Sequence, residues 1–475
     1  MFVGGAWADA LSGETRTATS PATGEAIGEI PEGGREDAQR AIAAANAAAP
    51  AWARLTAFER AAAMTRIADA IDRRRDSLAR TLTLDQGKPL HAEAYGEVEE
   101  LIAYWRNAAE DGIRLEGRLP NSVSPGKRVF LVRRPLGVVG VITPWNWPYT
   151  MPAELIAPAL ACGNAVVWTP APSTSVAAIA LAECVDEAEL PPGVFNLVTG
   201  PGPVVGDEIA RSAGTHAIGF IGSTATGRKV AEAAVGKPLV LELGGNGPLV
   251  VMDDADVGAA AEAAITACFL CAGQSCTAGE RLLVHAAVRD EFVARLAALA
   301  AERSVLGDPF EDGTTLGPLN NEPVAAKMDE HVADAVGRGA KVVAGGARAS
   351  GFPTGLYWPA TILDGVPADS LVAREETFGP IAPVVQIESL DEAIGLANAS
   401  PYGLLAAIYT RDLAGGLRFA DEVRTGWVNI NESTNYWESH LPFGGRSGSA
   451  SGTGRVGGAS SMETFTELQT VVLTA

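Results

Sequence analysis

The chain has 475 residues, 47% of them hydrophobic and 20% charged, and a formal net charge of −21. Such a length suits two or three domains, and the composition excludes a mainly disordered chain. The negative charge argues against nucleic acid and anionic membranes as partners, because it repels phosphate groups. No run reaches the roughly 20 apolar residues of a membrane span, and no secretory signal is expected. Five cysteines, an odd and small number, favour a reducing, cytoplasmic setting over a disulfide framework.

The first third of the chain predicts helices followed by one isolated strand. Turn residues dominate up to Gly34. Apolar residues at every third or fourth position then predict helices over 35–49, 58–84 and 93–109. The segment 117–135 contains VFLVRRP, whose β-branched and apolar residues predict a strand outside the later pattern.

From Gly137 onward, short apolar runs alternate with helical segments. The runs VVGVIT, NAVVW, VFNLV, HAIGFIG and PLVLEL predict strands, and helices are expected over 151–161, 175–188, 204–213 and 226–234. This alternation predicts a doubly wound α/β domain with a parallel sheet. A second alternating series begins near Pro248, so a second α/β domain is expected. The apolar run 467–473 predicts one further strand.

Three cysteines lie in the sequence CFLCAGQSC, at Cys268, Cys271 and Cys276. A zinc site needs three or four ligands, but the nearest histidine, His285, lies on a predicted strand and no second CxxC exists, so no metal site is predicted. Cys268 and Cys271 are typical of small core residues. Cys276 follows Gly-Gln-Ser after the helical run, where a thiol can face a cleft and act as a nucleophile. Its position alone leaves both interpretations open.

Two glycine-rich turns connect a predicted strand to a predicted helix, at 200–206 (GPGPVVG) and 222–227 (GSTATG). Glycines at such turns let backbone N–H groups approach a phosphate at the positive end of a helix. Neither turn matches GxGxxG, and a tight turn without a ligand would also use glycine. Two such turns in one α/β domain favour a dinucleotide.

Three more motifs contain candidate catalytic or binding groups. In TPWNWP, Asn146 stands between two tryptophans after a strand, and its amide can donate to an oxyanion. In LELGG, Glu242 ends an apolar strand, as a solvated strand end or as a general base beside a cleft. The motif EETFGP, with Glu376 and Phe378, is on its own typical of a capped loop.

Together these motifs resemble the aldehyde dehydrogenase superfamily, whose members oxidise aldehydes to carboxylic acids with NAD or NADP. The resemblance begins at VGGAW near the N-terminus and continues to the terminal strand. TPWNWP, GSTATG, LELGG, GQSC, EETFGP and PFGG stand in the family's order, and the 34-residue spacing from Glu242 to Cys276 is also the family's. Six motifs in register make chance a weak explanation.

The resemblance implies a role for each motif residue. Cys276 would be the nucleophile, Asn146 and the backbone N–H of Cys276 the oxyanion hole, and Glu242 the base for the water that cleaves the thioester. A glutamate at 242 favours hydrolysis to the free acid, because members that acylate coenzyme A lack it. The implied cofactor-binding residues are Ile142, Thr143, Pro144, Trp145, Thr169, Gly202, Gly222, Ser223, Glu376 and Phe378.

The sequence departs from the family where the cofactor's ribose would bind. Thr169 replaces the usual lysine, and Pro172 stands where NAD-preferring members often have a glutamate. Without the lysine, binding of the extra phosphate of NADP is less favoured. Without the glutamate, exclusive use of NAD is also less favoured. NAD is the expected cofactor, and NADP remains an alternative.

The implied substrate site is rich in aromatic residues, which fits an apolar or aromatic aldehyde, although several of them could simply pack a loop. No paired arginines indicate a dicarboxylic semialdehyde or a phosphorylated substrate. By alignment, Glu154, Tyr436 and His440 lie near the mouth of this site. The substrate-lining candidates are Trp147, Met151, Ser275, Thr277 and Trp437.

The resemblance also divides the chain into parts. A Rossmann-type NAD(P)-binding domain is expected over 1–116 and 136–243, a catalytic domain over 244–461, and oligomerisation strands over 117–135 and 462–475. Bare strand edges are usually covered by pairing, so a homodimer or homotetramer is expected, with a small-molecule aldehyde as the other partner.

Three alternatives remain open at this point. The first is a coenzyme-A-acylating aldehyde dehydrogenase. The second is a non-catalytic structural member of the family, although intact Cys276, Glu242 and Asn146 argue against it. The third is a thiol hydrolase, which has no histidine placed as a partner and leaves the dinucleotide pattern unexplained.

Overall fold

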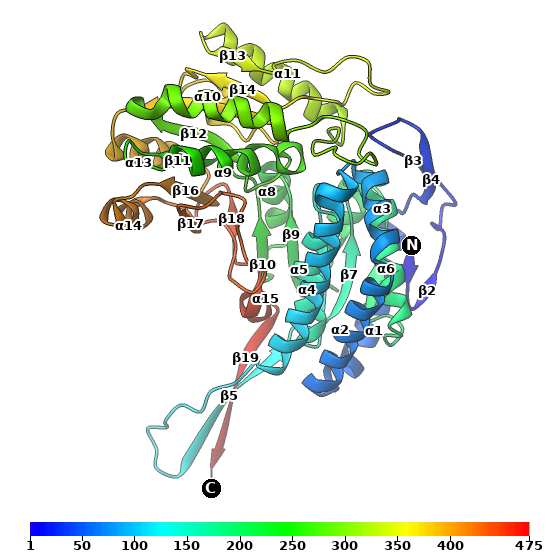
Figure 1. Ribbon diagram of the computed structural model, residues 1–475. Coiled ribbons are helices and arrows are strands. Elements are labelled where there is room, and N and C mark those ends of the chain that lie inside the picture. The colour runs from blue at the N-terminus through cyan, green and yellow to red at the C-terminus, as the bar shows by residue number, and fades with distance from the viewer. Residues whose placement is uncertain (475) are drawn as a thin grey trace.

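Two largely parallel sheets organise the molecule, and the computed structural model describes residues 1–474 (Figure 1). The first sheet has the strand order β18-β10-β9-β6-β7-β8-β1-β2. Its strands are β1 (Phe2–Val3), β2 (Ala6–Trp7), β6 (Val138–Ile142), β7 (Ala165–Thr169), β8 (Phe195–Leu197), β9 (Ala217–Ile221), β10 (Leu239–Glu242) and β18 (Gly452–Thr453). The strands β6 to β10 run parallel, whereas β18 pairs with β10 in the antiparallel sense.

Alternate side chains of the central strands enter two cores, one on each face of this sheet. On β6, Val139 and Val141 belong to one core and Val138 to the other. The helices and helical turns of this part are α1 (Arg35–Ala53), α2 (Ala57–Arg73), α3 (Arg75–Gln86), η1 (Leu90–Ala94), α4 (Tyr95–Ile113), α5 (Thr150–Ala161), η2 (Pro172–Thr174), α6 (Ser175–Glu187), η3 (Gly202–Gly206), α7 (Asp207–Arg211), α8 (Thr224–Ala233) and α15 (Gly458–Thr464). Helices therefore cover both faces, and the predicted doubly wound α/β class is confirmed.

Two helices that the periodicity predicts as continuous are broken. The segment 58–84 forms α2 and α3, because Arg74 leaves the helical region at φ −103° and ψ 12°. The segment 204–213 forms the π-helical turn η3 and only the short helix α7. Apolar spacing continues through both breaks, so periodicity alone could not reveal them.

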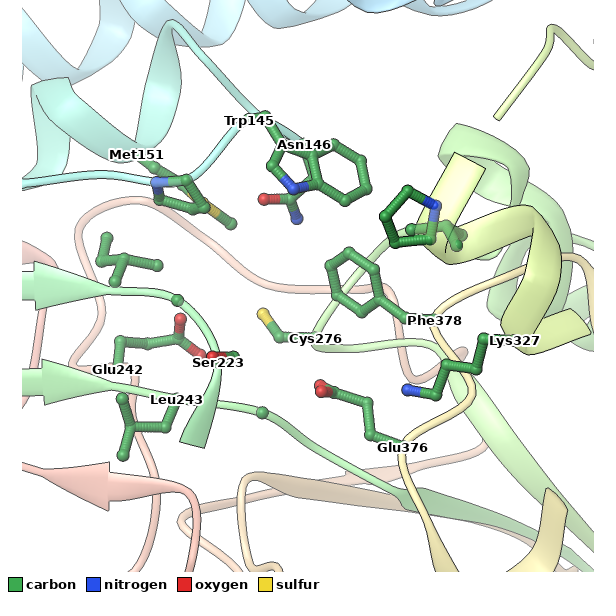
Figure 2. A pocket seen from close by; sticks show the side chains of 16 residues that line it. Trp145, Asn146, Met151, Ser223, Glu242, Leu243, Cys276, Lys327, Glu376 and Phe378 are labelled. Atoms are coloured by element: carbon green, nitrogen blue, oxygen red, sulfur yellow. The ribbon is translucent and has the colours of Figure 1, made fainter. Parts of the chain in front are cut away.

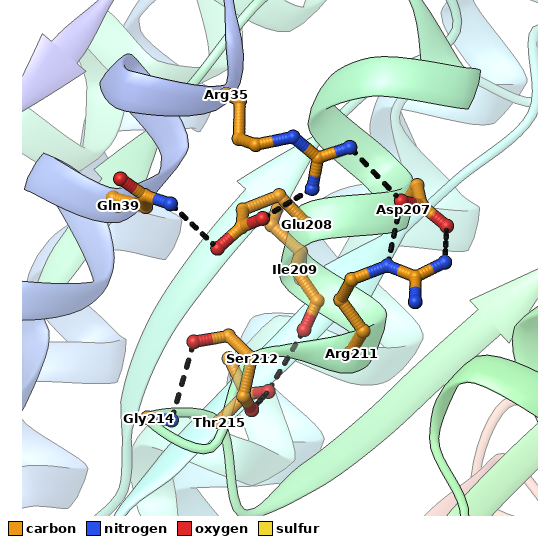
Figure 3. A network of polar contacts seen from close by, with 9 residues as sticks. All are labelled: Arg35, Gln39, Asp207, Glu208, Ile209, Arg211, Ser212, Gly214 and Thr215. Atoms are coloured by element: carbon orange, nitrogen blue, oxygen red, sulfur yellow. Dashed lines mark hydrogen bonds and ion pairs between the residues drawn. The ribbon is translucent and has the colours of Figure 1, made fainter.

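A polar network fixes α7 behind the glycine-rich turn 200–206 (Figure 3). Arg35 of α1 forms ion pairs with Asp207 and Glu208, and Arg211 pairs with Asp207 one turn along the same helix. Gln39 donates a hydrogen bond to Glu208 Oε1 over 3.1 Å. A helix this short gains little from its own backbone hydrogen bonds, so these contacts with α1 orient it.

The second sheet has the order β13-β14-β15-β12-β11-β16-β17, and β13 is its only antiparallel strand in the described part of the chain. Its strands are β11 (Gly247–Val251), β12 (Gly279–His285), β13 (Lys341–Ala344), β14 (Thr361–Asp364), β15 (Ile381–Ile387), β16 (Leu405–Tyr409) and β17 (Trp427–Ile430). Its helices are α9 (Val257–Phe269), η4 (Leu270–Gly273), α10 (Ala286–Arg303), α11 (Glu322–Gly337), α12 (Leu371–Arg374), α13 (Leu390–Ala399) and α14 (Leu413–Glu422).

Two antiparallel ribbons lie outside the sheets. One is the hairpin of β3 (Thr15–Thr19) and β4 (Ala26–Pro31). The other pairs β5 (Lys127–Pro135) with β19 (Thr466–Thr474), and Figure 1 shows it extending away from both sheets. The predicted domain limits stay a prediction, and β18, which lies within 244–461, pairs with the first sheet. None of the described helices has the length and apolar character that a membrane crossing needs.

A buried ion pair supports the loop that follows β6. Lys88 Nζ lies 2.5 Å from Glu97 Oε2, and both side chains are almost completely inaccessible to solvent. The same Nζ lies 3.2 Å from the centroid of the Trp147 ring, a cation–π contact. Glu97 Oε1 also accepts a hydrogen bond of 2.9 Å from the backbone N–H of Tyr149. The pair therefore holds the chain between Trp147 and Tyr149 against α4.

Replacing Lys88 with methionine should destabilise the protein strongly. The change leaves the Glu97 carboxylate buried without its cation, which costs about 3–5 kcal/mol. Denaturant unfolding measures the effect as a lower transition midpoint. Lys229→Met, at an exposed position of α8, is the matched control and should change the free energy of unfolding by about 0.5 kcal/mol or less. Equal midpoints for the two variants would contradict this view of the ion pair.

Candidate active site

A cavity of about 270 Å³ opens at the carboxyl ends of β6, β9 and β10. Ligands of open α/β sheets bind at this end of the strands. The cavity takes its walls from both sheets and from α11. Its lining residues are Pro144, Trp145, Asn146, Met151, Ile221, Gly222, Ser223, Glu242, Leu243, Gly244, Cys276, Pro323, Val324, Lys327, Glu376 and Phe378.

The loop that presents Cys276 leaves α9 through an unusual backbone turn. Cys271 and Ala272 both have φ of 54° and Gly273 has φ of 70°, so consecutive residues are left-handed. Non-glycine residues rarely adopt this conformation, which costs of order 1 kcal/mol or more for each. Glu93 Oε1 holds the turn by accepting a hydrogen bond of 2.9 Å from the Cys271 backbone N–H. Buried structure therefore keeps the nucleophile candidate in place.

Asn146 is 2% exposed and lies against the same loop. Its Nδ2 donates a hydrogen bond of 3.0 Å to the carbonyl of Gln274, two residues before Cys276. This bond uses one amide proton and leaves the other for the cavity. Figure 2 shows the Asn146 amide and the Cys276 thiol facing one space. If Cys276 Sγ formed a bond to a carbonyl carbon, the oxygen on that carbon would therefore meet a preorganised donor.

Glu242 ends β10, and its carboxyl faces the thiol across the cavity (Figure 2). The side chain is buried, and its Oε1 has no hydrogen-bond partner among the described residues. Burial raises the pKa of Glu242 well above its usual range. Burial, and then the nearby Glu242, likewise raise the pKa of the Cys276 thiol. A buried carboxyl with a strongly raised pKa that faces a thiol in a cavity is a candidate functional group.

The segment that joins the two sheets, Leu243 to Asn246, passes between these groups. A Cβ on Gly244 would lie 2.6 Å from a carboxylate oxygen of Glu376, and one on Gly245 would lie 2.2 Å from the Cys276 carbonyl oxygen. Glu376 Oε1 accepts a hydrogen bond of 2.8 Å from the Gly245 N–H. The two glycines of LELGG are therefore required by close approach to the site.

The other end of the cavity is aromatic and has a helix N-terminus. Trp145 and Phe378 meet edge to face, with ring centroids 5.6 Å apart. Ser223 caps α8 by accepting a hydrogen bond of 3.3 Å from the N–H of Thr226. Because the first N–H groups of a helix carry partial positive charge, this end is suited to a phosphate.

Six of the expected cofactor residues line this cavity, namely Pro144, Trp145, Gly222, Ser223, Glu376 and Phe378. The other four do not line it, namely Ile142, Thr143, Thr169 and Gly202. In the turn 200–206, the glycine that packing requires is Gly200, with φ of 152°, where a Cβ would lie 2.4 Å from the Gly33 carbonyl oxygen. A Cβ on Gly202 would meet nothing within 4 Å.

A second, much smaller chamber, with a volume of about 30 Å³, shares Met151, Glu242 and Cys276 with the main cavity. All five substrate-lining candidates line it. Tyr436 and His440, expected near its mouth, are not among its walls. Its lining residues are Trp147, Thr150, Met151, Glu154, Glu242, Ser275, Cys276, Thr277, Trp437 and Phe443.

Sequence reasoning missed some residues of both spaces. Lys327 of α11 lines the main cavity and lowers the pKa of Glu376, which burial raises overall. No motif surrounds Lys327, and its helix was not predicted. Asn435 Nδ2 donates a hydrogen bond to the carbonyl of Thr266, and its Oδ1 accepts a hydrogen bond from Thr277, the residue after Cys276. Only the folded chain brings these segments together.

Comparison with known proteins identifies the family. The sequence model of the "Aldehyde dehydrogenase family" matches residues 7–471. Glutarate-semialdehyde dehydrogenase of Pseudomonas aeruginosa is 42% identical, over 99% of this chain and 97% of its own length. The NADP(+) succinate-semialdehyde dehydrogenase of Escherichia coli is 40% identical, over 98% of this chain and 96% of its own. The crystal structure of succinate-semialdehyde dehydrogenase from Burkholderia pseudomallei has a TM-score of 0.97 and 39% identity, covering 100% of this chain and 97% of that one. The chain therefore belongs to the aldehyde dehydrogenase family, whose members oxidise aldehydes to acids with NAD or NADP.

Proposed function

We propose that this chain oxidises its aldehyde to the free carboxylic acid, with Cys276 as nucleophile, Asn146 as oxyanion donor and Glu242 as general base. The observation that carries the proposal is that a thiol, an amide and an unpartnered buried carboxyl share one cavity. Their chemistry matches the three needs of the reaction, which are attack on the carbonyl carbon, stabilisation of the alkoxide and activation of water.

The remaining walls of the main cavity fit a nicotinamide dinucleotide. The Glu376 carboxylate can accept hydrogen bonds from ribose hydroxyls beside Gly244, where a Cβ would block the approach. The N-terminus of α8 at Ser223 can receive the pyrophosphate. Trp145 and Phe378 offer apolar surface to the nicotinamide ring. When bound, the dinucleotide accepts the hydride that the substrate loses.

The first half of the reaction forms a bond between Cys276 Sγ and the aldehyde carbon. The thiol proton leaves to Glu242 or to water, and the carbonyl oxygen becomes an alkoxide. The free amide proton of Asn146 and the backbone N–H of Cys276 stabilise this charge, at about 3 kcal/mol for each donor. The alkoxide then re-forms its carbonyl by releasing hydride, which leaves a thioester on Cys276.

The second half cleaves the thioester with water. Glu242 takes a proton from the attacking water, the carbon–sulfur bond breaks and the Cys276 thiolate leaves with release of the acid. A raised pKa makes the Glu242 carboxylate a stronger base once it is ionised, which suits this step. Transfer of the acyl group to coenzyme A is the alternative reaction, and it needs no such base. Analysis of the product, as free acid or thioester, separates the two.

Glu242→Gln should arrest the enzyme after one turnover. In this variant water still accepts the thiol proton, so hydride transfer can occur and we expect a burst of one NADH per active site. Steady-state turnover then falls about 100-fold or more, as for loss of a general base. Because burial raises the pKa of Glu242, wild-type turnover should rise with pH over a range above that of an exposed glutamate, and the variant should lose this rise.

Stopped-flow NADH absorbance measures the burst of Glu242→Gln. Cys276→Ala is the control, because it lacks the nucleophile and should give no burst. Wild-type turnover in Glu242→Gln would remove the base assignment, and a burst in Cys276→Ala would remove the nucleophile assignment.

We propose that NAD is preferred over NADP. Thr169, at the end of β7, places a buried hydroxyl without a hydrogen-bond partner where a phosphate-binding cation would be needed. A charge-assisted bond to the extra phosphate contributes about 1.5–3 kcal/mol, so kcat/KM should favour NAD by about 10-fold or more. Thr169→Lys should raise kcat/KM for NADP. A wild-type preference for NADP would contradict this proposal.

We propose a homodimer or homotetramer that forms through the ribbon of β5 and β19. In the described residues β19 pairs only with β5, and its Leu468, Val471, Val472 and Leu473 are exposed. Light scattering should give a dimer or tetramer for the wild type. The double change Val471→Asp and Leu473→Asp, on one face of β19, should shift it towards monomer. A wild-type monomer would contradict the proposal.

We also propose a cytoplasmic location. All five cysteines are free, and the candidate nucleophile Cys276 has to stay reduced to react. A reducing compartment provides this condition.

A further inference from the structure

The chamber behind Cys276 has acidic and aromatic walls. No lysine, arginine or histidine stands among the described residues that line it. Trp147, Thr150 and Glu154 lie three or four positions apart and so share one side of the α5 N-terminal region. Glu154 therefore faces the chamber with no cationic side chain beside it. The chamber would present this carboxyl group to the end of a bound aldehyde that lies farthest from Cys276.

Glu154 is held in this wall by one hydrogen bond. Tyr104 Oη donates to Glu154 Oε1, whereas no described donor reaches Oε2. Burial raises the pKa of Glu154 to about 8. Glu154 in turn raises the pKa of both Cys276 and Glu242, so it lies within electrostatic range of the reacting groups. One oxygen of the Glu154 carboxyl group thus has no partner among the described residues and remains available to a substrate near Cys276.

Two tryptophans form the aromatic part of the chamber. Trp147 and Trp437 meet edge to face with ring centroids 6.0 Å apart. Trp437 Nε1 donates a hydrogen bond of 3.0 Å to Glu100 Oε1, which fixes the ring in the wall. Burial raises the pKa of Glu100 to about 7. Lys88, the cation against Trp147, is buried and paired with Glu97, so it is not available to an anionic substrate.

A substrate's charge decides how such walls receive it. A carboxylate at the far end of the aldehyde would lose its hydration beside Glu154 and gain no cationic partner, which is unfavourable. An ammonium group would pair with Glu154 in its carboxylate form, beside the two tryptophans, which is favourable. Bound ammonium would also hold Glu154 in its ionised form.

We propose that the preferred substrate of this chain is an aldehyde with a positively charged amino group at its far end, and that Glu154 selects this charge. The inference rests on the proposed oxidation at Cys276. It separates this chain from the glutarate- and succinate-semialdehyde dehydrogenases among its relatives, since those names denote aldehydes that carry a carboxylate.

Three aldehydes of similar length test the proposal on the wild-type enzyme: 3-aminopropanal, butanal and 4-oxobutanoate, which are cationic, neutral and anionic. With the preferred dinucleotide, kcat/KM should decrease in that order. The cation should exceed the anion by about 10- to 100-fold, as expected for one charge-assisted contact.

Glu154→Gln removes the charge and keeps the shape. It should lower the ratio of kcat/KM for 3-aminopropanal to kcat/KM for butanal about 10-fold, and this ratio cancels any effect of Glu154 on the reacting groups that both aldehydes share. Glu110→Gln, at an exposed position of α4, removes the same charge outside the chamber and should leave the order of substrates unchanged. Propylammonium and butyrate as inhibitors of butanal oxidation provide a second measurement, and the ammonium ion should bind more tightly.

The outcomes distinguish the two proposals. If butanal and the other aldehydes all give no NADH or NADPH, the proposed function fails. If butanal is oxidised but 4-oxobutanoate matches or exceeds 3-aminopropanal, only the charge preference fails. A cation preference that persists in Glu154→Gln would remove Glu154 as the selecting residue.

Discussion

The close packing of two consecutive glycines where the two sheets join constrains the whole active site. Gly244 and Gly245 directly follow the strand that ends in Glu242 and lead into the second sheet. One glycine leaves room for the carboxylate of Glu376 and the other for the carbonyl of Cys276. Glu242, Cys276 and Glu376 therefore come together where the two sheets join. A side chain at position 245 would displace the Cys276 carbonyl, and one at position 244 would displace the Glu376 carboxylate.

The loop that carries Cys276 has a strained backbone, and neighbouring contacts stabilise it. Its left-handed residues Cys271 and Ala272 are strained, and strain persists only where surrounding contacts over-determine the backbone. Those contacts come from Gln86 of α3 and Glu93 of η1, two elements that belong to the part of the chain around the first sheet. The site thus depends on burial in the first sheet's core as much as on the second sheet that carries the loop.

The sequence predicted the class of fold and the catalytic candidates because both depend on local patterns. Alternating apolar runs indicated parallel strands, and Asn146, Glu242 and Cys276 each stand in a short motif at a strand or helix end. Long-range contacts left no such pattern. The break at Arg74 and the place of Lys327 on α11 depend on tertiary packing. Likewise, the sequence GPGPVVG of the turn 200–206 does not reveal which of its glycines is required. The structure shows that packing requires Gly200 and not Gly202.

The start of α4 and the turn before it carry a stripe of polar side chains at Glu93, Glu97, Glu100 and Tyr104, spaced four, three and four residues apart. Each forms a hydrogen bond with a different part of the site. In chain order, the partners are the backbone of Cys271, the backbone of Tyr149, the Trp437 ring and the Glu154 carboxyl group. This stripe therefore contacts both the loop that carries Cys276 and the walls of the chamber. A shift of the start of α4 along its axis would displace the Cys276 loop and the chamber walls together. Substitutions in the other walls of the chamber would change its shape and leave that loop in place.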